Sequence, residues 1–365
     1  MADRPGSDIE HIAKLRLIRS ENVGPVSYRH LTARYGSASA ALDALPELAR
    51  RGGGRAFRIA DIGAVHREIE ATEAAGARFV FLGDSNYPAR LAETEDAPPV
   101  LAIRGDIALA HRRTVGIVGA RNASAAAIRF ARGLASDLAA ANIVVVSGLA
   151  RGIDAAAHSG AITGGTIGVI AGGIDNIYPP ENAELYAALY ERGLVVAEQP
   201  IGTEPQARHF PRRNRLISGL SAGIVVVEAA PRSGSLITAR FAGEQGREVM
   251  AVPGFPLDPR AQGCNQLIRD GATLVQSAAD IAETITPFGG VRLGAGGSRF
   301  TAPPPTDADD NARSAVTALL SLTPVAIDEL VRLSGEPPAV VQTVLLELEL
   351  AGRLVRHAGG RASLA

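Results

Sequence analysis

Residues 115–154 read VGIVGARNASAAAIRFARGLASDLAAANIVVVSGLARGID. Two short apolar runs, Val115–Val118 and Ile143–Ser147, flank an alanine-rich stretch, Ser124–Ala140, which has the length of a helix. Near-continuous apolar strands indicate burial on both faces of a sheet, which is typical of parallel strands covered by helices. This stretch therefore predicts a strand, a crossover helix and a second strand parallel to the first.

The same alternation extends over residues 76–286. Short β-branched runs recur there with helix-length segments between most of them, and right-handed crossovers then build a doubly wound sheet. The predicted fold class is α/β with a mostly parallel sheet. The other strand candidates are Arg78–Leu82, Thr166–Ile170, Leu194–Glu198, Ile224–Glu228, Glu248–Val252 and Thr273–Val275.

The two ends of the chain differ in character from this central region. Residues 1–75 read as helical, and their turn at Asn22–Pro25 predicts a helix-hairpin-helix or SAM-like module; a small helical bundle that packs on the next domain is the preferred alternative. Residues 287–310 are rich in glycine and proline, as in a flexible linker. Residues 311–365 predict three helices and a two-stranded wing, the pattern of a winged helix.

The composition of the 365-residue chain argues against several classes of protein. The single cysteine, Cys264, forms no disulfide within one chain and supplies no cysteine-based zinc site, and it fits a reducing compartment. The N-terminus lacks the apolar core of a signal peptide, and the longest apolar runs are far too short to cross a bilayer. We expect a cytoplasmic protein with no membrane contact, no bound metal and no cofactor.

The formal net charge is −1, so a nucleic-acid site has to be a local basic patch. Two loops that follow predicted strands combine glycine, a hydroxyl group and an arginine with a helix start. Amide groups and the helix dipole at such a place bind phosphate. The first loop holds Gly119, Arg121 and Ser124, and the second holds Ser147, Gly148 and Arg151.

Two further features admit more than one interpretation. Asp154 and His158 lie four residues apart on one helix face, either as an acid–base or metal pair or as an aspartate at a helix N-terminus that bonds a nearby histidine. The second interpretation is preferred. The loop Gly172–Asn182 combines two glycines with Pro179 and Pro180, and it fits a binding loop or a rigid turn equally well.

The segment Arg208–Arg215 carries the most informative charge pattern. It holds four arginines and no acid within eight residues, with Phe210 among them. Phosphate neutralisation together with base stacking requires that mixture of side chains. A later loop adds hydroxyl and amide donors at Ser233 and Gly234. Since most of these loops follow strands, we expect them to converge at one sheet edge as a groove that binds phosphate.

In their order along the chain, these blocks resemble the DNA-processing protein family DprA, also called Smf. The resemblance covers roughly residues 79–276. In the G-[SA]-R turn this chain has Ala120, so a hydroxyl donor found in many members is absent. The matching blocks include Gly119–Arg121, SGLARGID at Ser147–Asp154, YPPEN at Tyr178–Asn182, FPRRNRLISGLS at Phe210–Ser221 and SGSLITA at Ser233–Ala239.

The resemblance implies an extended Rossmann-like fold, a helical domain before it and a winged helix after it, in a protein that is not an enzyme. It implies that the protein binds and protects single-stranded DNA, forms a homodimer and helps to load the recombinase RecA in natural transformation. Leu267 and Ile268, near the end of the sheet, are the predicted dimer contacts. The predicted DNA-binding residues are Gly119, Arg121, Ser147, Gly148, Arg151, Phe210, Arg212, Arg213, Asn214, Arg215, Ser233 and Gly234.

The winged helix itself is predicted to serve protein contacts or regulation. Residues 309–365 hold five arginines and seven acidic residues. The candidate recognition helix, Ala339–Ala351, carries Glu347 and Glu349 with no basic residue. Such a helix meets DNA phosphates with repulsion, so duplex DNA is not the expected ligand.

Two enzyme classes are the alternatives. A phosphoribohydrolase of a related fold requires a P-G-G-x-G-T phosphate loop, which Pro253–Phe255 does not supply. A dinucleotide-dependent oxidoreductase requires the G-x-G-x-x-G fingerprint, of which the first loop offers only Gly116 and Gly119.

Overall fold

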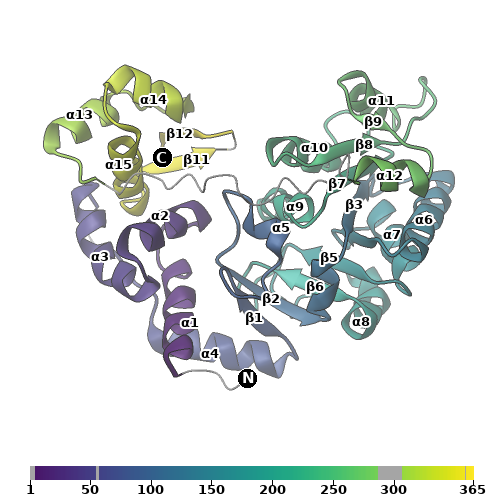
Figure 1. Cartoon of the computed structure of the whole chain (residues 1–365), viewed down its shortest axis with the longest axis horizontal. Coiled ribbons are helices and arrows are strands. Elements are labelled where there is room, and N and C mark those ends of the chain that lie inside the picture. Colours follow the sequence, from purple (N-terminus) through teal and green to yellow (C-terminus); the bar gives the residue numbers. More distant parts are fainter. Residues whose placement is uncertain (1–4, 55–56, 287–305, 358) are drawn as a thin grey trace. The chain divides into compact units, whose positions relative to one another are not determined.

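The computed structural model describes residues 5–54, 57–286, 306–357 and 359–365 (Figure 1). The chain divides into two compact units. A central unit spans residues 68–292, and a terminal unit joins residues 1–67 with residues 293–365. The structure thus brings together, in one unit, the two chain ends that the sequence predicts as separate domains. The predicted linker lies mostly outside the described residues.

A nine-stranded sheet forms the middle of the central unit, in the order β1-β2-β6-β5-β4-β3-β7-β8-β9. The strands from β6 to β9 are parallel, and β1 and β2 pair antiparallel at one edge. The predicted α/β class is therefore confirmed. The strands are β1 Arg78–Phe81, β2 Val100–Gly105, β3 Thr114–Gly119, β4 Val144–Ser147, β5 Thr166–Ile170, β6 Leu194–Ala197, β7 Gly223–Val227, β8 Glu248–Ala251 and β9 Thr273–Leu274.

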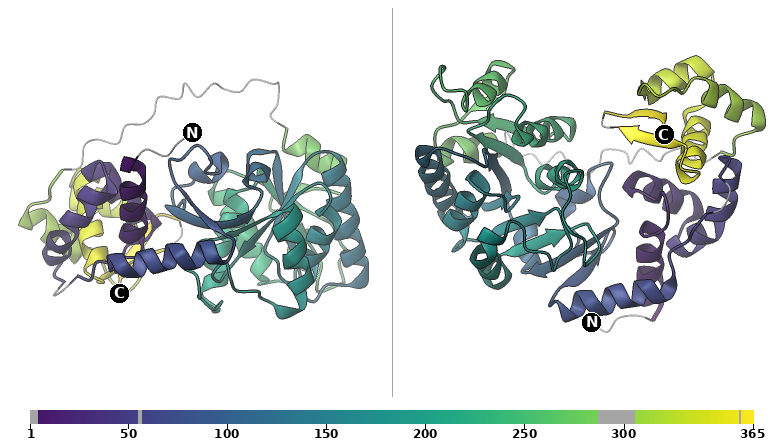
Figure 2. Two further views of the ribbon diagram at one scale, coloured as in Figure 1. Left: turned by 90° about the horizontal axis from the view of Figure 1, so that it is seen from below. Right: turned by 180° about the vertical axis from the view of Figure 1, so that it is seen from behind.

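Helices cover both faces of this sheet (Figure 2). In β4, Val144 and Val146 pack into the cluster that includes α9 and α10, while Val145 packs into the cluster of α6 and α7. This two-sided burial is why the strands read as unbroken apolar runs. On the two faces lie α6 Ala125–Ala140, α7 Ile153–Ala161, α8 Ala183–Arg192 and α12 Ala278–Thr284, and α5 Ala89–Ala92, α9 His209–Gly219, α10 Gly234–Glu244 and α11 Gln262–Arg269.

Strand order reverses at β3. From β3 the chain proceeds through β4, β5 and β6 on one side, and then returns to place β7 and β8 on the other side. Open α/β sheets bind ligands in the crevice outside the carboxyl ends of the strands at such a reversal. The loops after β3, β4 and β7 therefore occupy the position from which a binding site is expected.

The terminal unit contains a helical part from the start of the chain and a winged helix from its end. The predicted wing forms as β11 and β12, and β10 adds a third strand. The helices and strands are α1 Pro5–Ile18, α2 Pro25–Tyr35, α3 Ala38–Arg51, α13 Asp310–Ala318, α14 Ile327–Ser334, α15 Pro338–Leu350, β10 Val325–Ala326, β11 Leu354–His357 and β12 Arg361–Leu364. Helix α4, Ile62–Ala74, leads toward β1.

Helix α15 is shared between the two parts of the terminal unit. Val341 and Leu345 lie in the apolar cluster of the winged helix, whereas Leu346 and Leu350 lie in the cluster of the N-terminal helices, with Leu45. A helix that is apolar all round is a buried helix. In a winged helix this third helix is the one that reads DNA, and here it is core to both ends of the chain.

Within the described parts of the chain, no helix has both the length and the apolar character that crossing a bilayer requires. The same residues contain no group of three histidine, cysteine, aspartate or glutamate side chains arranged to hold a metal ion.

Candidate nucleic-acid interface

Three loops meet at the carboxyl end of β3. The amide of Ala120 donates to the carbonyl oxygen of Glu228 at 2.7 Å, and the Ala120 carbonyl accepts from the amide of Ile153 at 3.2 Å. The loops after β3, β4 and β7 are thereby joined through one residue. Gly119 makes this approach feasible, because a β-carbon at that position would lie 1.9 Å from the carbonyl oxygen of Val227.

The backbone of these loops is unusual. Leu149, Glu228 and Arg232 have positive φ angles of 53°, 55° and 66°. Non-glycine residues in this region cost free energy, and they gather at binding and active sites, where the surrounding structure enforces them. Only two other described non-glycine residues, Asn22 and Asn142, share the feature.

An arginine and two aromatic rings lie together at this edge. The Arg121 guanidinium carbon is 5.0 Å from the centre of the Phe210 ring, within the range of a cation–π contact. The Tyr178 ring centre is 5.7 Å from that of Phe210, and the two rings are inclined by 53°. Arg121 is exposed, Phe210 is half-buried and Tyr178 is 46% exposed. A cation and stacking surfaces are therefore presented to solvent side by side.

Arg213 belongs to the interior. It is only 6% exposed, and its guanidinium donates to the carbonyl oxygens of Gly148 and Val169. Asp154, also buried, accepts from the Gly148 amide at 3.1 Å. Burial raises the pKa of Asp154, and the charge of Arg213 acts against that rise. Arg213 therefore fixes the loop after β4 from the interior of the protein.

Arg215 is likewise committed to the protein. It is 8% exposed and forms an ion pair with Glu198, and it donates to the carbonyl oxygen of Asp96 at 2.5 Å. The predicted phosphate contacts of Arg213 and Arg215 are thus not supported by their burial. Arg213 and Arg215 lie in the interior, whereas the neighbouring Arg212 is exposed.

The remaining predicted residues divide by exposure. Ser147 is buried, and its hydroxyl donates to the carbonyl oxygen of Ile117, so the predicted hydroxyl donor faces inward. Asn214 accepts from Arg213 Nε at 3.2 Å and donates to the carbonyl oxygen of Gly234 at 3.3 Å. Ser233 caps α10. Exposed positions are Arg121, Arg151, Arg212 and Gly234, and sequence analysis did not select two others, Tyr178 and Arg232.

The Asp154–His158 bond that was preferred from the sequence is wrong. His158 Nδ1 lies 2.7 Å from Thr166 Oγ1, while Asp154 bonds the Gly148 amide. Burial, and next the charge of Arg213, lower the pKa of His158 to about 3. His158 is thus a neutral residue of the interior.

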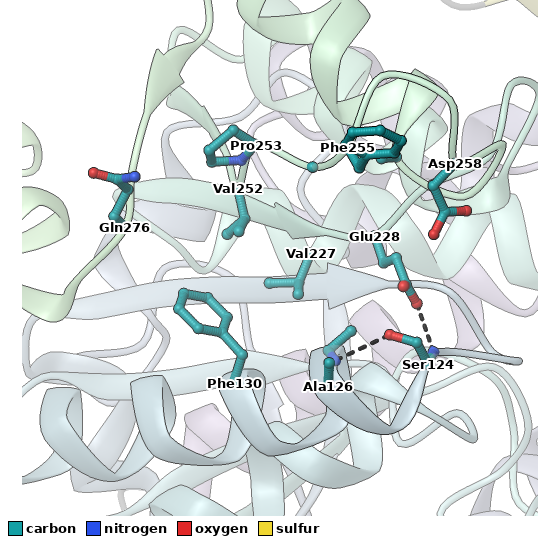
Figure 3. Close-up of a pocket in the computed structure, with 13 residues that line it drawn as sticks. Ser124, Ala126, Phe130, Val227, Glu228, Val252, Pro253, Phe255, Asp258 and Gln276 are labelled. Carbon is teal, nitrogen blue, oxygen red and sulfur yellow. Dashed lines mark hydrogen bonds between the residues drawn. The ribbon is translucent and has the colours of Figure 1, made fainter.

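A cavity of about 390 Å³ lies beside these loops, between the start of α6 and the segment that follows β8 (Figure 3). Glu228 and Asp258 contribute its carboxylates, and Phe130 and Val252 contribute apolar walls. Glu228 accepts from the Ser124 amide at 2.7 Å, and Asp258 pairs with Arg260 at 2.9 Å. Two carboxylates repel phosphate, so this cavity is not part of the candidate interface.

The hairpin turn of the N-terminal helices is occupied by the chain itself. The Gly24 amide donates to Ser27 Oγ at 2.7 Å, and the Val23 amide donates to the carbonyl oxygen of Ser20. The Asn22 side chain donates to the carbonyl oxygen of Leu350 at the end of α15 at 3.1 Å. These amides are the groups that such a turn offers to phosphate, and here the protein uses them internally.

Three family models match the chain. They are DNA recombination-mediator protein A over residues 78–286, a DprA-like N-terminal HHH domain over residues 8–71 and a DprA winged helix domain over residues 300–360. The sequence is 44% identical to DNA processing protein DprA of Bacillus subtilis, across 60% of this chain and 75% of that protein. It is 42% identical to protein Smf of Escherichia coli, across 76% and 75% of the two chains.

Solved structures of two DprA proteins are among those similar to this one. The X-ray structure of DNA processing protein A from Streptococcus pneumoniae superposes with a TM-score of 0.62 at 34% identity, covering 75% of this chain and 96% of that one. A structure concerning the single-stranded DNA binding mode of the Helicobacter pylori protein gives a TM-score of 0.53 at 27% identity, over 58% and 97%.

Proposed function

The chain belongs to the DNA recombination-mediator protein A family, the DprA/Smf proteins, and we propose that its central unit binds single-stranded DNA. The observation that carries the proposal is the exposed Arg121 set against the Phe210 ring at the carboxyl edge of the sheet. A guanidinium neutralises phosphate, and an aromatic ring stacks on any base, so the pair binds a strand without reading its sequence. Arg212 and Arg232 add exposed positive charge, whereas exposed Arg151 pairs with Glu181.

In this proposal the buried arginines act as positioning residues. Arg213 holds the loop after β4, and Arg215 ties α9 to Glu198 and Asp96. Both lie on the helix that carries exposed Arg212. Substituting either one is therefore expected to weaken DNA binding by displacing the loop after β4 or helix α9.

The bound strand is the substrate on which the recombinase RecA is loaded, as the family resemblance implies. This step involves no chemistry on the part of the chain, and the proposal needs neither a catalytic residue nor a cofactor. It is tested by following RecA-dependent ATP hydrolysis on single strands precoated with single-stranded DNA-binding protein, with and without this protein.

A homodimer through the central unit is also proposed. Leu267 and Ile268 lie on α11 and pack partly against their own core, next to the short edge strand β9. Leu274 of β9 is 46% exposed. An open sheet edge flanked by apolar side chains suits a two-fold contact. Light scattering at micromolar concentration is expected to give twice the chain mass, and a monomer contradicts this.

The winged helix is proposed to serve protein contacts rather than duplex DNA. Glu347 on α15 is 1% exposed and pairs with Arg313 through two bonds of 2.8 and 3.0 Å. Arg353 donates to the carbonyl oxygen of Gly52, and Arg356 pairs with Glu349 at 2.8 Å. The charges that a DNA-reading helix and wing require are thus used within the unit.

The deciding experiment is a titration of a fluorescent oligothymidylate with Arg121→Ala and Phe210→Ala. Phe210→Ala is expected to cost about 1–3 kcal/mol if a base stacks on the ring. Arg129→Ala is the matched control, because Arg129 is an exposed arginine of the same unit on α6. Unchanged affinity of a folded Arg121→Ala/Phe210→Ala double variant would refute the proposed site.

A further inference from the structure

Tyr178 is one of the large hydrophobic residues that stay exposed in the folded protein. It is 46% exposed, and the preceding Ile177 is 40% exposed. A ring left half in water gains only part of the free energy that burial provides. Its nearest aromatic neighbour is Phe210, with ring centres 5.7 Å apart.

The backbone of Tyr178, in contrast, is held from within. The hydroxyl of Tyr186, a residue only 1% exposed, accepts from the Tyr178 amide at 3.4 Å and donates to the Tyr178 carbonyl oxygen at 3.0 Å. Both polar groups of one peptide residue are thereby bonded to a single buried side chain. The result is an exposed ring on a fixed backbone, which is the arrangement that lowers the entropy cost of binding.

The same loop is tied to the loop that Arg213 holds. Asn182 donates to the carbonyl oxygen of Leu149 at 2.8 Å, and Arg151 pairs with Glu181 at 2.5 Å. The position of Tyr178 is thus linked to the loops of the candidate interface. For Gly172–Asn182 these bonds support the rigid turn, and the binding loop stays a prediction.

The inclination of the rings leaves room for a ligand. At 53° the Tyr178 and Phe210 rings do not lie flat on one another, so neither face is fully covered by the other ring. Arg121 approaches Phe210 at 5.0 Å. The cation of Arg121 and the ring of Tyr178 therefore both adjoin the Phe210 ring.

We propose that Tyr178 forms a second nucleobase-stacking subsite, which takes the base next to the one that stacks on Phe210. The inference rests on the proposed function, because it concerns a strand already bound at Arg121 and Phe210. It commits to a nucleobase as the ligand, since an aromatic platform beside a cation suits a flat ring carried on a phosphate backbone. Every base offers such a face, so the subsite tolerates all sequences.

The chain has no tryptophan, which makes a direct test practicable. Tyr178→Trp introduces a single reporter at the subsite. We expect its emission to be quenched when a 20-nucleotide oligothymidylate binds, and to remain unquenched with an abasic strand of equal length. Phe255→Trp is the matched control, because Phe255 is a 68% exposed aromatic residue beside the acidic cavity; its emission is expected to stay constant.

Affinity gives the second measurement. Tyr178→Ala is expected to weaken oligothymidylate binding about 5- to 150-fold, the range that base–aromatic stacking supports, and to leave the salt dependence unchanged. Tyr178→Phe keeps the ring and is expected to bind as the unchanged protein does. Thermal unfolding establishes that each variant is folded.

The outcomes separate this inference from the proposed function. Tyr178→Ala within twofold of the unchanged affinity, while Arg121→Ala and Phe210→Ala are weakened, overturns the subsite alone. Quenching of Tyr178→Trp by the abasic strand overturns it as well. If none of the three alanine variants changes affinity, the whole interface is wrong.

Discussion

Arg213 and Asp154 hold Gly148 by both of its backbone polar groups: the guanidinium donates to its carbonyl oxygen, and the carboxylate accepts from its amide. A β-carbon at Gly148 would lie 2.5 to 2.7 Å from the guanidinium atoms, so the arrangement requires glycine at this position. The loop after β4 is therefore held by two buried groups of opposite charge, Arg213 and Asp154.

Arg213→Ala is therefore expected to lower stability and DNA affinity together. Removing the guanidinium leaves the buried carbonyl oxygens of Gly148 and Val169 without their donor, and each such loss costs about 1–3 kcal/mol. It also removes the positive charge that acts against the effect of burial on Asp154. Arg121→Ala is expected to lower affinity with little change in the urea midpoint. Urea unfolding and DNA titration of both variants measure this; an Arg213→Ala variant that keeps its stability and loses only affinity would restore a direct contact.

Salt dependence distinguishes surface from interior arginines. Each phosphate neutralised on a single strand contributes about −0.7 to the slope of log affinity against log salt. Arg121→Ala is expected to make the slope less negative by about that amount, whereas Arg129→Ala leaves it unchanged. Titrations at several salt concentrations give the slopes. Equal slopes for all three proteins would mean that Arg121 contacts no phosphate.

Deletion of residues 309–365 is expected to leave most single-stranded DNA affinity intact, because the candidate interface belongs to the central unit. The N-terminal helices, in contrast, lose Leu346 and Leu350 from their cluster and should become sensitive to protease. Limited proteolysis combined with DNA titration checks both expectations. A large loss of affinity with the central unit still folded would assign DNA binding to the winged helix.

Gly52→Ala is expected to destabilise the terminal unit. The added β-carbon would lie 2.0 Å from the carbonyl oxygen of Glu347 on α15, and overpacking of this kind costs roughly 1–3 kcal/mol. Gly133→Ala on α6 is the control, since no atom lies within 4 Å of its added carbon. Thermal unfolding should show a lower midpoint temperature for the terminal unit of Gly52→Ala. The DNA affinity of this variant should be preserved.

Stability is expected to fall between neutral and acidic pH. The folded-state pKa of His158 is about 3, whereas an unfolded histidine has a pKa near 6.5. Between these two pH values the unfolded chain binds a proton that the folded chain does not bind, so acid favours unfolding. The contribution is complete above pH 6.5 and decreases as the pH falls toward 3. Urea midpoints at pH 7 and pH 5 measure it. His158→Gln should reduce the difference, and exposed His66→Gln should not.

The sheet could be predicted because strands that are buried on both faces appear in the sequence as near-continuous apolar runs. Ile143–Ser147 predicts what forms as β4, and the predicted two-stranded wing of residues 311–365 forms as β11 and β12. The glycine-containing loops converge because parallel strands place their carboxyl ends at one edge.

The burial of Arg213 has a signal in the sequence. Arg213 lies three and four residues before Leu216 and Ile217, which are buried on α9, so helical spacing places all three on one face. The composition of the run predicts a surface, whereas its helical spacing predicts that Arg213 is buried. The position of Tyr178 has no such signal, because its loop has no periodicity and is fixed by bonds to the Tyr186 hydroxyl.

Helix α15 also affects the order in which the parts of the chain complete their folding during synthesis. The N-terminal helices leave the ribosome before the central unit, whereas Leu346 and Leu350, which complete their cluster, are added after it. The central unit has all of its strands before that point and is free to fold first. The N-terminal helices are thus made before the central unit but completed after it, and their apolar faces stay uncovered until translation reaches α15.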